Sequence, residues 1–228
     1  MKAIVLFSGG LDSTTALYVA RRDGRHPVCL SIHYGQLHER ELASAKKISS
    51  HLGFEHWIIP ISLPWGGSAL TDASLSVPKG RGESEIAQGI PVTYVPARNS
   101  IFLALATSLA ETKGADAIYF GANALDYSGY PDCRPEFIEA FETVIRRGTQ
   151  AGSEGRAIQV MAPLLRLSKK DIVRLAAELG VPFEWTWSCY EGKEFPCGTC
   201  DSCILRAKGF REAGIEDPLL AGMHPKAP

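Results

Sequence analysis

The chain lacks any apolar run long enough to cross a bilayer, and only five apolar residues precede a Gly-rich turn near its N-terminus. A signal-peptide core needs a longer run, so the sequence predicts no targeting segment and a cytoplasmic location. Net charge is also nearly absent, because 24 Lys and Arg stand against 25 Asp and Glu, a formal charge of −1. Proteins that depend on a phosphate backbone for affinity are usually basic, so we expect no membrane partner and no direct nucleic-acid binding.

Repeats and low-complexity segments are absent as well, and the chain instead alternates short apolar strands with helical patterns. Strands are expected at 2–7, 27–32, 57–61, 115–120 and 158–161, and helices at 11–22, 37–52, 99–112, 135–147 and 168–179. This order predicts a doubly wound, mostly parallel α/β sheet with helices on both faces. Residues 62–97, which are rich in Gly, Pro and Ser, interrupt the alternation, and such a segment is usually a lid or unstructured.

The Gly-rich turn at residues 8–14, Ser-Gly-Gly-Leu-Asp-Ser-Thr, stands between the first strand and the first helix. Unpaired N–H groups at the start of a helix bind anions, and Gly9 and Gly10 allow a phosphate to approach the backbone. The turn lacks the lysine of the Gly-x-x-x-x-Gly-Lys loop and the third glycine of the dinucleotide-binding fingerprint. It resembles the pyrophosphate loop of the ATP pyrophosphatases, Ser-Gly-Gly-x-Asp-Ser. That resemblance implies binding of the β- and γ-phosphates, with the α-phosphate left open to attack.

Four of the six cysteines lie close together near the C-terminal end, with the spacing C-x7-C-x2-C-x2-C. In the cytosol such a cluster indicates a metal site rather than disulfides. Four thiolates can complete a tetrahedron and leave no open position, so we expect one structural zinc ion bound by Cys189, Cys197, Cys200 and Cys203. The last three of these cysteines also fit half of a ferredoxin-type iron–sulfur pattern, which remains an alternative.

Residues 121–137 combine acids, an arginine, tyrosine rings and a thiol directly after a predicted strand, where open α/β sheets bind ligands. The stretch 126–137, Asp-Tyr-Ser-Gly-Tyr-Pro-Asp-Cys-Arg-Pro-Glu-Phe, closely resembles the signature of the 7-cyano-7-deazaguanine synthase family of queuosine biosynthesis. The resemblance extends along nearly the whole chain and includes residues 8–14, 33–36, 93–99, 188–190 and 196–203. The family often has Gly where Ala97 stands, a small-for-small change that we expect to be tolerated.

This resemblance implies an ATP-dependent ligase that converts 7-carboxy-7-deazaguanine and ammonia into a nitrile. Removal of both carboxylate oxygens implies two adenylation steps at one site, first on the acid and then on the amide. The family also implies Mg²⁺ with ATP and a tendency to form homodimers. No segment looks like a glutamine amidotransferase, so free ammonia is the expected nitrogen source. We expect an ATP-binding domain at 1–184 and a four-cysteine zinc-binding region at 185–228 packed on it.

Candidate site residues follow from the same resemblance. Asp12, which would help place Mg²⁺, and Arg98, which could neutralise a substrate carboxylate or phosphate, are the predicted catalytic residues. ATP is expected to contact Ser8, Gly9, Gly10, Leu11, Asp12, Ser13, Thr14, Thr15, Ala16, Leu17, Tyr18, His33 and Tyr34. The substrate is expected to contact Arg98, Asn99, Tyr130, Asp132 and Arg134. Among these, Asp132 is the expected acceptor for the N–H groups of the base, and Tyr127 or Tyr130 could stack on its ring.

Several alternatives remain open from the sequence. Arg98 could form a helix-start salt bridge, and Asp126 and Glu136 could be no more than favourable charges at a helix N-terminus. A tRNA-modifying sulfur or nitrogen transferase would use the same loop with an iron–sulfur cluster or a catalytic thiol, for which Cys133 is the candidate. An adenine-nucleotide sensor would bind ATP without turnover, and a related enzyme would stop at the amide.

Overall fold

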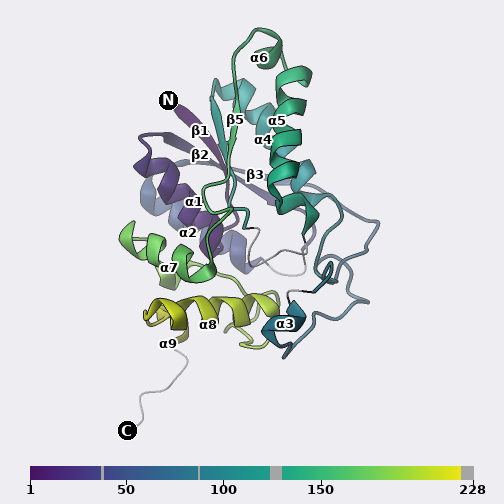
Figure 1. The fold of residues 1–228 in the computed structure, drawn as a ribbon, viewed down its shortest axis with the longest axis vertical. Helices are drawn as coiled ribbons and strands as arrows, with labels where there is room; N and C mark the ends of the chain where they lie inside the picture. The colour runs from purple at the N-terminus through teal and green to yellow at the C-terminus, as the bar shows by residue number, and fades with distance from the viewer. Residues whose placement is uncertain (37–38, 87, 124–129, 222–228) are drawn as a thin grey trace.

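The computed structural model describes residues 1–36, 39–86, 88–123 and 130–221, and a five-stranded parallel sheet forms its centre (Figure 1). Strand order reverses at β1, because the chain runs outward from β1 to β3 and then places β4 on the other side of β1. Ligands of such sheets bind at the carboxyl ends of the strands where the order reverses. The strands, in the spatial order β3-β2-β1-β4-β5 and all parallel, are β1 (Lys2–Leu6), β2 (His26–His33), β3 (Glu55–Pro60), β4 (Ala117–Tyr119) and β5 (Gln159–Met161).

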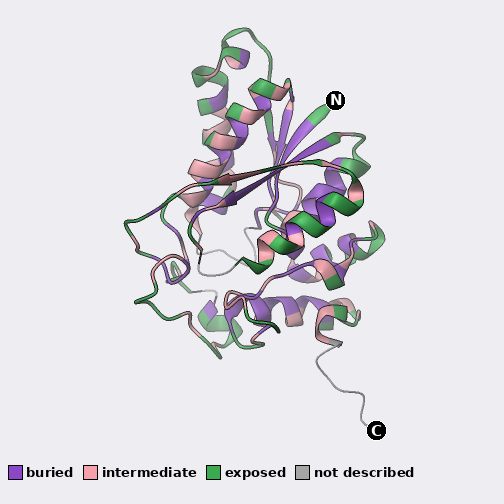
Figure 2. Ribbon diagram, turned by 180° about the vertical axis from the view of Figure 1, so that it is seen from behind, coloured by how far each residue is buried: buried purple, intermediate pink, exposed green. Residues whose placement is uncertain are grey.

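Helices cover both faces of the sheet, which confirms the predicted doubly wound α/β fold (Figure 2). Side chains alternate along β1, so Ile4 and Leu6 pack in a core with α4 and α5, whereas Ala3 and Val5 pack with α1 and α2. The longer helices are α1 (Leu11–Arg22), α2 (Arg40–Leu52), α4 (Arg98–Lys113), α5 (Pro135–Gly148), α7 (Lys169–Glu178) and α8 (Asp201–Ala213). Single turns are α3 (Glu83–Ile86), α6 (Gln150–Ser153), α9 (Pro218–Ala221) and the 3-10 turns η1 (Pro131–Cys133) and η2 (Phe183–Trp185).

The segment 62–97 contains only the short helix α3 among its described residues, as its composition predicts, but it is held against the C-terminal region. Gly80 N–H donates to Thr199 O at 2.8 Å, and Arg81 Nε donates to Asp201 Oδ1 at 3.0 Å. Lys208 of α8 pairs with Glu83 of α3 at 2.8 Å. These contacts join residues more than a hundred positions apart, so they fix the middle of the segment on the first turns of α8.

The C-terminal region, residues 183–221, lies below the sheet in the view of Figure 1, with α8 beside α7. A buried ion pair holds its end in place, because Arg206 Nε donates to Asp217 Oδ2 at 2.6 Å. The same guanidinium donates to Phe183 O and to Thr186 Oγ1, so one side chain joins α8, the turn η2 and the start of α9. Within the described residues, none of the helices combines the length and the apolar character that crossing a bilayer requires.

Candidate functional site

A cavity of about 240 Å³ opens at the carboxyl ends of β1, β2 and β4. Its walls come from the Gly-rich turn, the ends of these strands, the first turns of α2 and α4, and the C-terminal region. Gly121, two residues after β4, closes one side, because a Cβ there would lie 3.0 Å from the backbone of Ser13. The sequence predicted a ligand crevice at this edge of the sheet, and the cavity lies there.

The Gly-rich turn leads directly from β1 into α1. Gly9 has φ +86°, and a Cβ on it would lie 2.4 Å from Glu41 O and 2.5 Å from Ala45 N, so a side chain has no room there. The hydroxyls of Ser8 and Ser13 lie 3.0 Å apart, and Ser8 Oγ accepts from Gly10 N–H at 3.2 Å. The turn therefore rests on α2 and directs its hydroxyls and the N-terminus of α1 toward the cavity, an arrangement that suits an anion.

A lysine from a distant helix reaches this turn. Lys169, the first residue of α7, donates to both carboxylate oxygens of Asp12, at 2.9 and 3.0 Å. Its stem is buried against α8, where a Cβ on Gly209 would lie 2.4 Å from Lys169 Cγ. Gly209 thus leaves space for the side chain of Lys169. The Gly-rich turn has no lysine of its own, and Lys169 brings a positive charge to it from α7.

Arg98 begins α4 on the opposite side of the cavity. Its guanidinium carbon lies 5.8 Å from the ring centre of Tyr34 and 5.7 Å from that of Phe102, and its Nε donates to Asn99 Oδ1 at 3.2 Å. No carboxylate among the described residues lies within ion-pair distance of it, so these residues offer no support for a helix-start salt bridge. Stacking and hydrogen bonding hold its planar fork at the cavity wall, where it can accept an anionic ligand.

Ala97, the N-cap of α4, is the one described non-glycine residue with positive φ, at 53°. A Cβ in this left-handed region costs free energy, so a glycine would relieve strain at this position. Tyr94 Oη accepts a hydrogen bond from Ala97 N–H at 3.1 Å. This strained residue directly precedes Arg98 and Asn99, so it sets the direction in which α4 enters the cavity.

The family-signature stretch 126–137, called here the central segment, is described from residue 130 onward, and this part lies beside Arg98. Tyr130 lines the cavity and its hydroxyl lies 2.9 Å from Thr93 Oγ1. Asp132 is buried, accepts from Asn99 N–H at 3.1 Å, and has a pKa raised by burial. Burial also raises the pKa of the Cys133 thiol to about 12, so at neutral pH it is not the thiolate that a nucleophile needs. Asp126 and Tyr127 lie outside the described residues.

Glu41, in the first turn of α2, brings a second carboxylate to the cavity. A Cβ on Gly10 would lie 3.6 Å from Glu41 Oε1, so this carboxylate lies against the Gly-rich turn. Burial raises its pKa to about 7, a rise that the charge of Arg98 opposes and that of Asp12 reinforces. Within the described part of the chain no hydrogen-bond or ion-pair partner reaches its oxygens.

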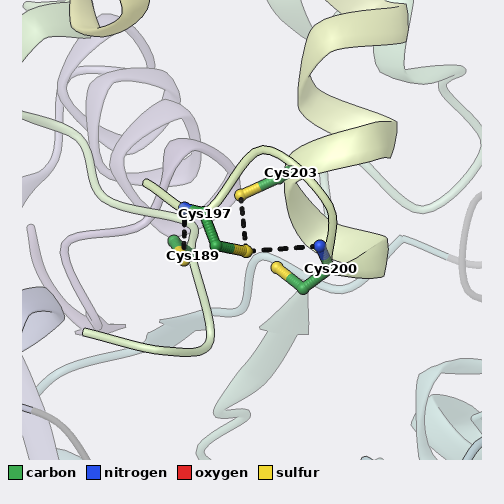
Figure 3. Close-up of side chains that lie close together, drawn as sticks. All are labelled: Cys189, Cys197, Cys200 and Cys203. Carbon is green, nitrogen blue, oxygen red and sulfur yellow. Dashed lines mark hydrogen bonds between the residues drawn. The ribbon is translucent and has the colours of Figure 1, made fainter. Parts of the chain in front are cut away.

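The four predicted cysteine ligands come together (Figure 3), and Cys189 stands in the chain between Ser188 and Tyr190 of the cavity wall. All four sulfurs lie within 4.8 Å of one another, and Cys197 Sγ is 4.0 Å from Cys203 Sγ. Four thiolates at about 2.3 Å from one ion lie about 3.8 Å apart in a tetrahedron, so the cluster needs little adjustment to bind a metal. Backbone N–H groups of Glu191 and Cys197 donate to Cys189 Sγ, and hydrogen bonds from the neighbouring thiols lower the pKa of Cys189. These four residues can therefore hold a metal ion.

The structure brings half of the predicted contact residues to the cavity wall, namely Ser8, Gly10, Leu11, Asp12, Ser13, Tyr34, Arg98, Asn99 and Tyr130. The others lie behind the wall or outside it: Gly9, Thr14, Thr15, Ala16, Leu17, Tyr18, His33, Asp132 and Arg134. Most residues of the second group belong to helix α1. Only the first turn of this helix faces the cavity, and Leu17 packs in the core against β1. The binding roles of both groups stay predictions.

Sequence reasoning missed Glu41, Lys169, Ser202 and Arg206, which also line the cavity. Each stands on an amphipathic or mixed helix where a charged or polar residue predicts an exposed face. The one available signal is the Ser-Lys-Lys-Asp start of α7, a pattern typical of a helix cap, and Ser168 Oγ does accept from Asp171 N–H at 3.3 Å. That pattern does not indicate that Lys169 faces a cavity.

The family model and the curated relatives that match this chain agree with one another. A protein-family model described as queuosine biosynthesis protein QueC matches residues 2–214. A 7-cyano-7-deazaguanine synthase from Trichodesmium erythraeum is 54% identical over 96% of this chain and 100% of its own length. Another, from an Anaeromyxobacter species, is 57% identical over 96% of this chain and 95% of its own length. A solved structure of NMN synthetase from Francisella tularensis, 18% identical, gives a TM-score of 0.47 over 99% of this chain and 79% of that one.

Both the family match and the identity to these relatives extend over almost the entire chain, including the Gly-rich turn, the central segment and the cysteine cluster. The family signature noticed at residues 126–137 is thereby confirmed as a family assignment. The chain belongs to the QueC family of 7-cyano-7-deazaguanine synthases, ligases of queuosine biosynthesis.

Proposed function

We propose that this enzyme converts 7-carboxy-7-deazaguanine and free ammonia into the nitrile by two successive adenylations in the one cavity. The observation that carries this proposal is the convergence of an anion-binding turn, Lys169 and Arg98 on a cavity that also contains aromatic side chains. The turn is suited to a pyrophosphate group, and Arg98 is suited to the carboxylate of the substrate. A nucleotide and a planar acid bound between them would react at the α-phosphate.

The adenylation step would use the fixed positive groups on one side of the cavity. Negative charge develops on pyrophosphate as its bond to the α-phosphate breaks, so preorganised donors there lower the barrier. The N-terminus of α1, the hydroxyls of Ser8 and Ser13, and the ammonium group of Lys169 are such donors. Asp12 would hold the Mg²⁺ ion that accompanies ATP, since Mg²⁺ is usually bound by one or two carboxylates together with phosphates. Bound there, the ion would neutralise phosphate charge.

Substrate recognition would fall to the other side of the cavity. Arg98 can bind a carboxylate through a bidentate pair, and the aromatic rings of Tyr34 and Tyr130 can contact the heterocycle or the adenine. We retain Asp132 and Arg134 as residues for recognition of the base. The carboxylate of Asp132 already accepts a hydrogen bond from Asn99 N–H, so a small shift of η1 would be needed for it to reach a ligand.

The metal in the cysteine cluster would be zinc with a structural role. Four sulfur ligands leave no position for a substrate, and the four cysteines are not among the residues that line the cavity. Through Cys189 the metal would position Ser188 and Tyr190, which do line the cavity. We further propose that residues 185–228 form a zinc-binding region on an ATP-binding domain of residues 1–184, and that the enzyme forms a homodimer.

Mass spectrometry of the product tests this function. Incubation with ATP, Mg²⁺, ammonium and 7-carboxy-7-deazaguanine should give the nitrile together with AMP and pyrophosphate. Accumulation of the amide alone would contradict nitrile formation, and binding of ATP without AMP release would favour a nucleotide sensor. A colourless protein with about one zinc per chain is expected, whereas a brown protein with visible absorbance would indicate an iron–sulfur cluster.

A further inference from the structure

The proposed reaction imposes a requirement on one atom of the substrate. The nitrogen enters as ammonium, the dominant form of ammonia at neutral pH, and leaves in the nitrile without any proton. A base must therefore accept protons at that atom in both halves of the reaction. The base has to lie in the cavity, between the loop that holds pyrophosphate and the arginine that holds the acid, because the acyl carbon is attacked there.

We propose that Glu41 is this base. Its carboxylate lines the cavity, lies against the Gly-rich turn on the side of Gly10, and has no hydrogen-bond or ion-pair partner among the residues that the structure describes. Asp12 and Arg98 line the same cavity, so the Glu41 carboxylate shares one space with both sides of the reacting group. An unpartnered carboxylate in this position would also attract ammonium. The inference rests on the function proposed above.

Other ionisable groups at the described cavity wall are less suited. Asp12 is engaged by Lys169 through both of its oxygens, and in the proposed reaction it holds Mg²⁺ instead. The thiol of Cys133 and the phenols of Tyr34 and Tyr130 have pKa values raised by burial, so they hold their protons at neutral pH. Glu41, whose pKa is raised by burial to about 7, can both accept a proton and release it.

The bonds and protons balance as follows. Ammonium gives one proton to Glu41, and the lone pair of the resulting ammonia forms a C–N bond at the acyl carbon. Once Glu41 has released that proton to solvent, it accepts a second one from the added nitrogen while the C–O bond to AMP breaks, and AMP leaves with the electron pair of that bond. In the second half the amide oxygen attacks the α-phosphate and pyrophosphate leaves. Glu41 then takes the remaining N–H protons as the C–O bond breaks and the C≡N bond forms, and it returns each proton to solvent.

The substitution Glu41→Gln tests the proposal, because the amide keeps the size of the side chain and removes its basicity. Adenylation of the acid does not involve the nitrogen, so exchange of labelled pyrophosphate into ATP, dependent on 7-carboxy-7-deazaguanine and measured without ammonium, should stay within about threefold of wild type. Nitrile formation should fall roughly 10²–10⁴-fold, the usual contribution of a general base. Hydroxylamine, which is uncharged at neutral pH, should still trap the acyl-adenylate as a hydroxamate.

Glu39→Gln removes the same charge two residues away, from a side chain that is 77% exposed, and serves as the matched control with unchanged nitrile formation. Loss of pyrophosphate exchange in E41Q would overturn the proposal and assign Glu41 to nucleotide or Mg²⁺ binding. Full nitrile formation by E41Q would overturn it as well. A wild-type enzyme that makes no nitrile from ammonium would instead contradict the proposed function on which the inference rests.

Discussion

Lys169 Nζ lies 2.9 and 3.0 Å from the two carboxylate oxygens of Asp12, although 157 positions separate the two residues in the chain. The pair connects α7 to the first turn of α1, next to the turn that we assign to pyrophosphate. The ammonium group of Lys169 thus lies at the site where other phosphate-binding loops carry a lysine of their own. When ATP enters, this ammonium group can move from the carboxylate to a phosphate oxygen.

Substitution of Lys169 by Met should therefore lower kcat/KM by roughly 10²–10³-fold, the cost of removing one fixed donor from developing negative charge. Steady-state release of pyrophosphate measures this effect. Lys170→Met removes a charge from the next residue, which does not line the cavity, and should leave the rate nearly unchanged. Equal rates for wild type and K169M would exclude a role for Lys169 with the phosphates.

Arg98 provides a test that separates the two halves of the reaction. If its guanidinium binds the substrate carboxylate, Arg98→Met should raise the KM for the acid by about tenfold or more, as expected for loss of a charge-assisted pair. The amide of 7-carboxy-7-deazaguanine carries no such charge, so the KM for the amide should change far less. Similar losses with both substrates, measured by nitrile formation, would count against a carboxylate-binding role.

Removal of one cysteine should affect the metal and the fold together, because the free energy of metal binding is part of the free energy of folding. Cys200→Ser should lose its metal by elemental analysis and unfold at a lower temperature. Cys29→Ala changes a buried cysteine outside the cluster and should keep its full metal content. A stable, metal-free and active C200S protein would refute a structural metal.

The ion pair between Arg81 and Asp201 should contribute to stability because its carboxylate is only 4% exposed. Arg81→Met would leave this carboxylate buried without a partner, and we expect the free energy of unfolding to fall by about 1–3 kcal/mol. Denaturant unfolding measures the change. Arg156→Met breaks an exposed pair with Glu154 and should cost less than about 0.5 kcal/mol. Equal losses in the free energy of unfolding for the two variants would show that Arg81 does not hold segment 62–97 in place.

Glu41 makes the stability of the protein depend on pH. Burial raises its pKa from 4.5 in the unfolded chain to about 7 in the folded protein, so the folded protein binds this proton more tightly. The resulting stability is fully present below pH 4.5 and is lost as the pH rises to about 7. Relative to E41Q, which cannot titrate at this position, the wild type should therefore become less stable across that interval. A constant difference in the free energy of unfolding would show that Glu41 titrates normally.

Much of the fold could be predicted because its signals are local. The apolar run before the Gly-rich turn, the glycine after α4 and the serine at the start of α7 each indicate an element boundary within a few residues. The prediction of the cysteine cluster was equally local, since three of its ligands lie within seven residues. Strand ends were less accurate: β4 begins at Ala117 rather than at residue 115, because only three of its residues pair with β1.

The composition of the cavity could not be predicted, because it depends on contacts between distant segments. Nothing near Lys169 in the sequence indicates that Gly209 leaves room for its side chain or that Asp12 accepts hydrogen bonds from its ammonium group. Glu41 is similar, since a glutamate in the first turn of an amphipathic helix is typical of an exposed face. Only the packing of α2 against the Gly-rich turn brings it to the cavity.

The stoichiometry of AMP to nitrile is the most direct test of the central claim that one cavity performs two adenylations. Quantitative chromatography of a completed reaction with limiting 7-carboxy-7-deazaguanine should give two AMP and two pyrophosphate for each nitrile. The same enzyme, supplied with the amide, should give one AMP for each nitrile without ammonium. A single AMP for each nitrile formed from the acid would contradict the second adenylation and the mechanism built on it.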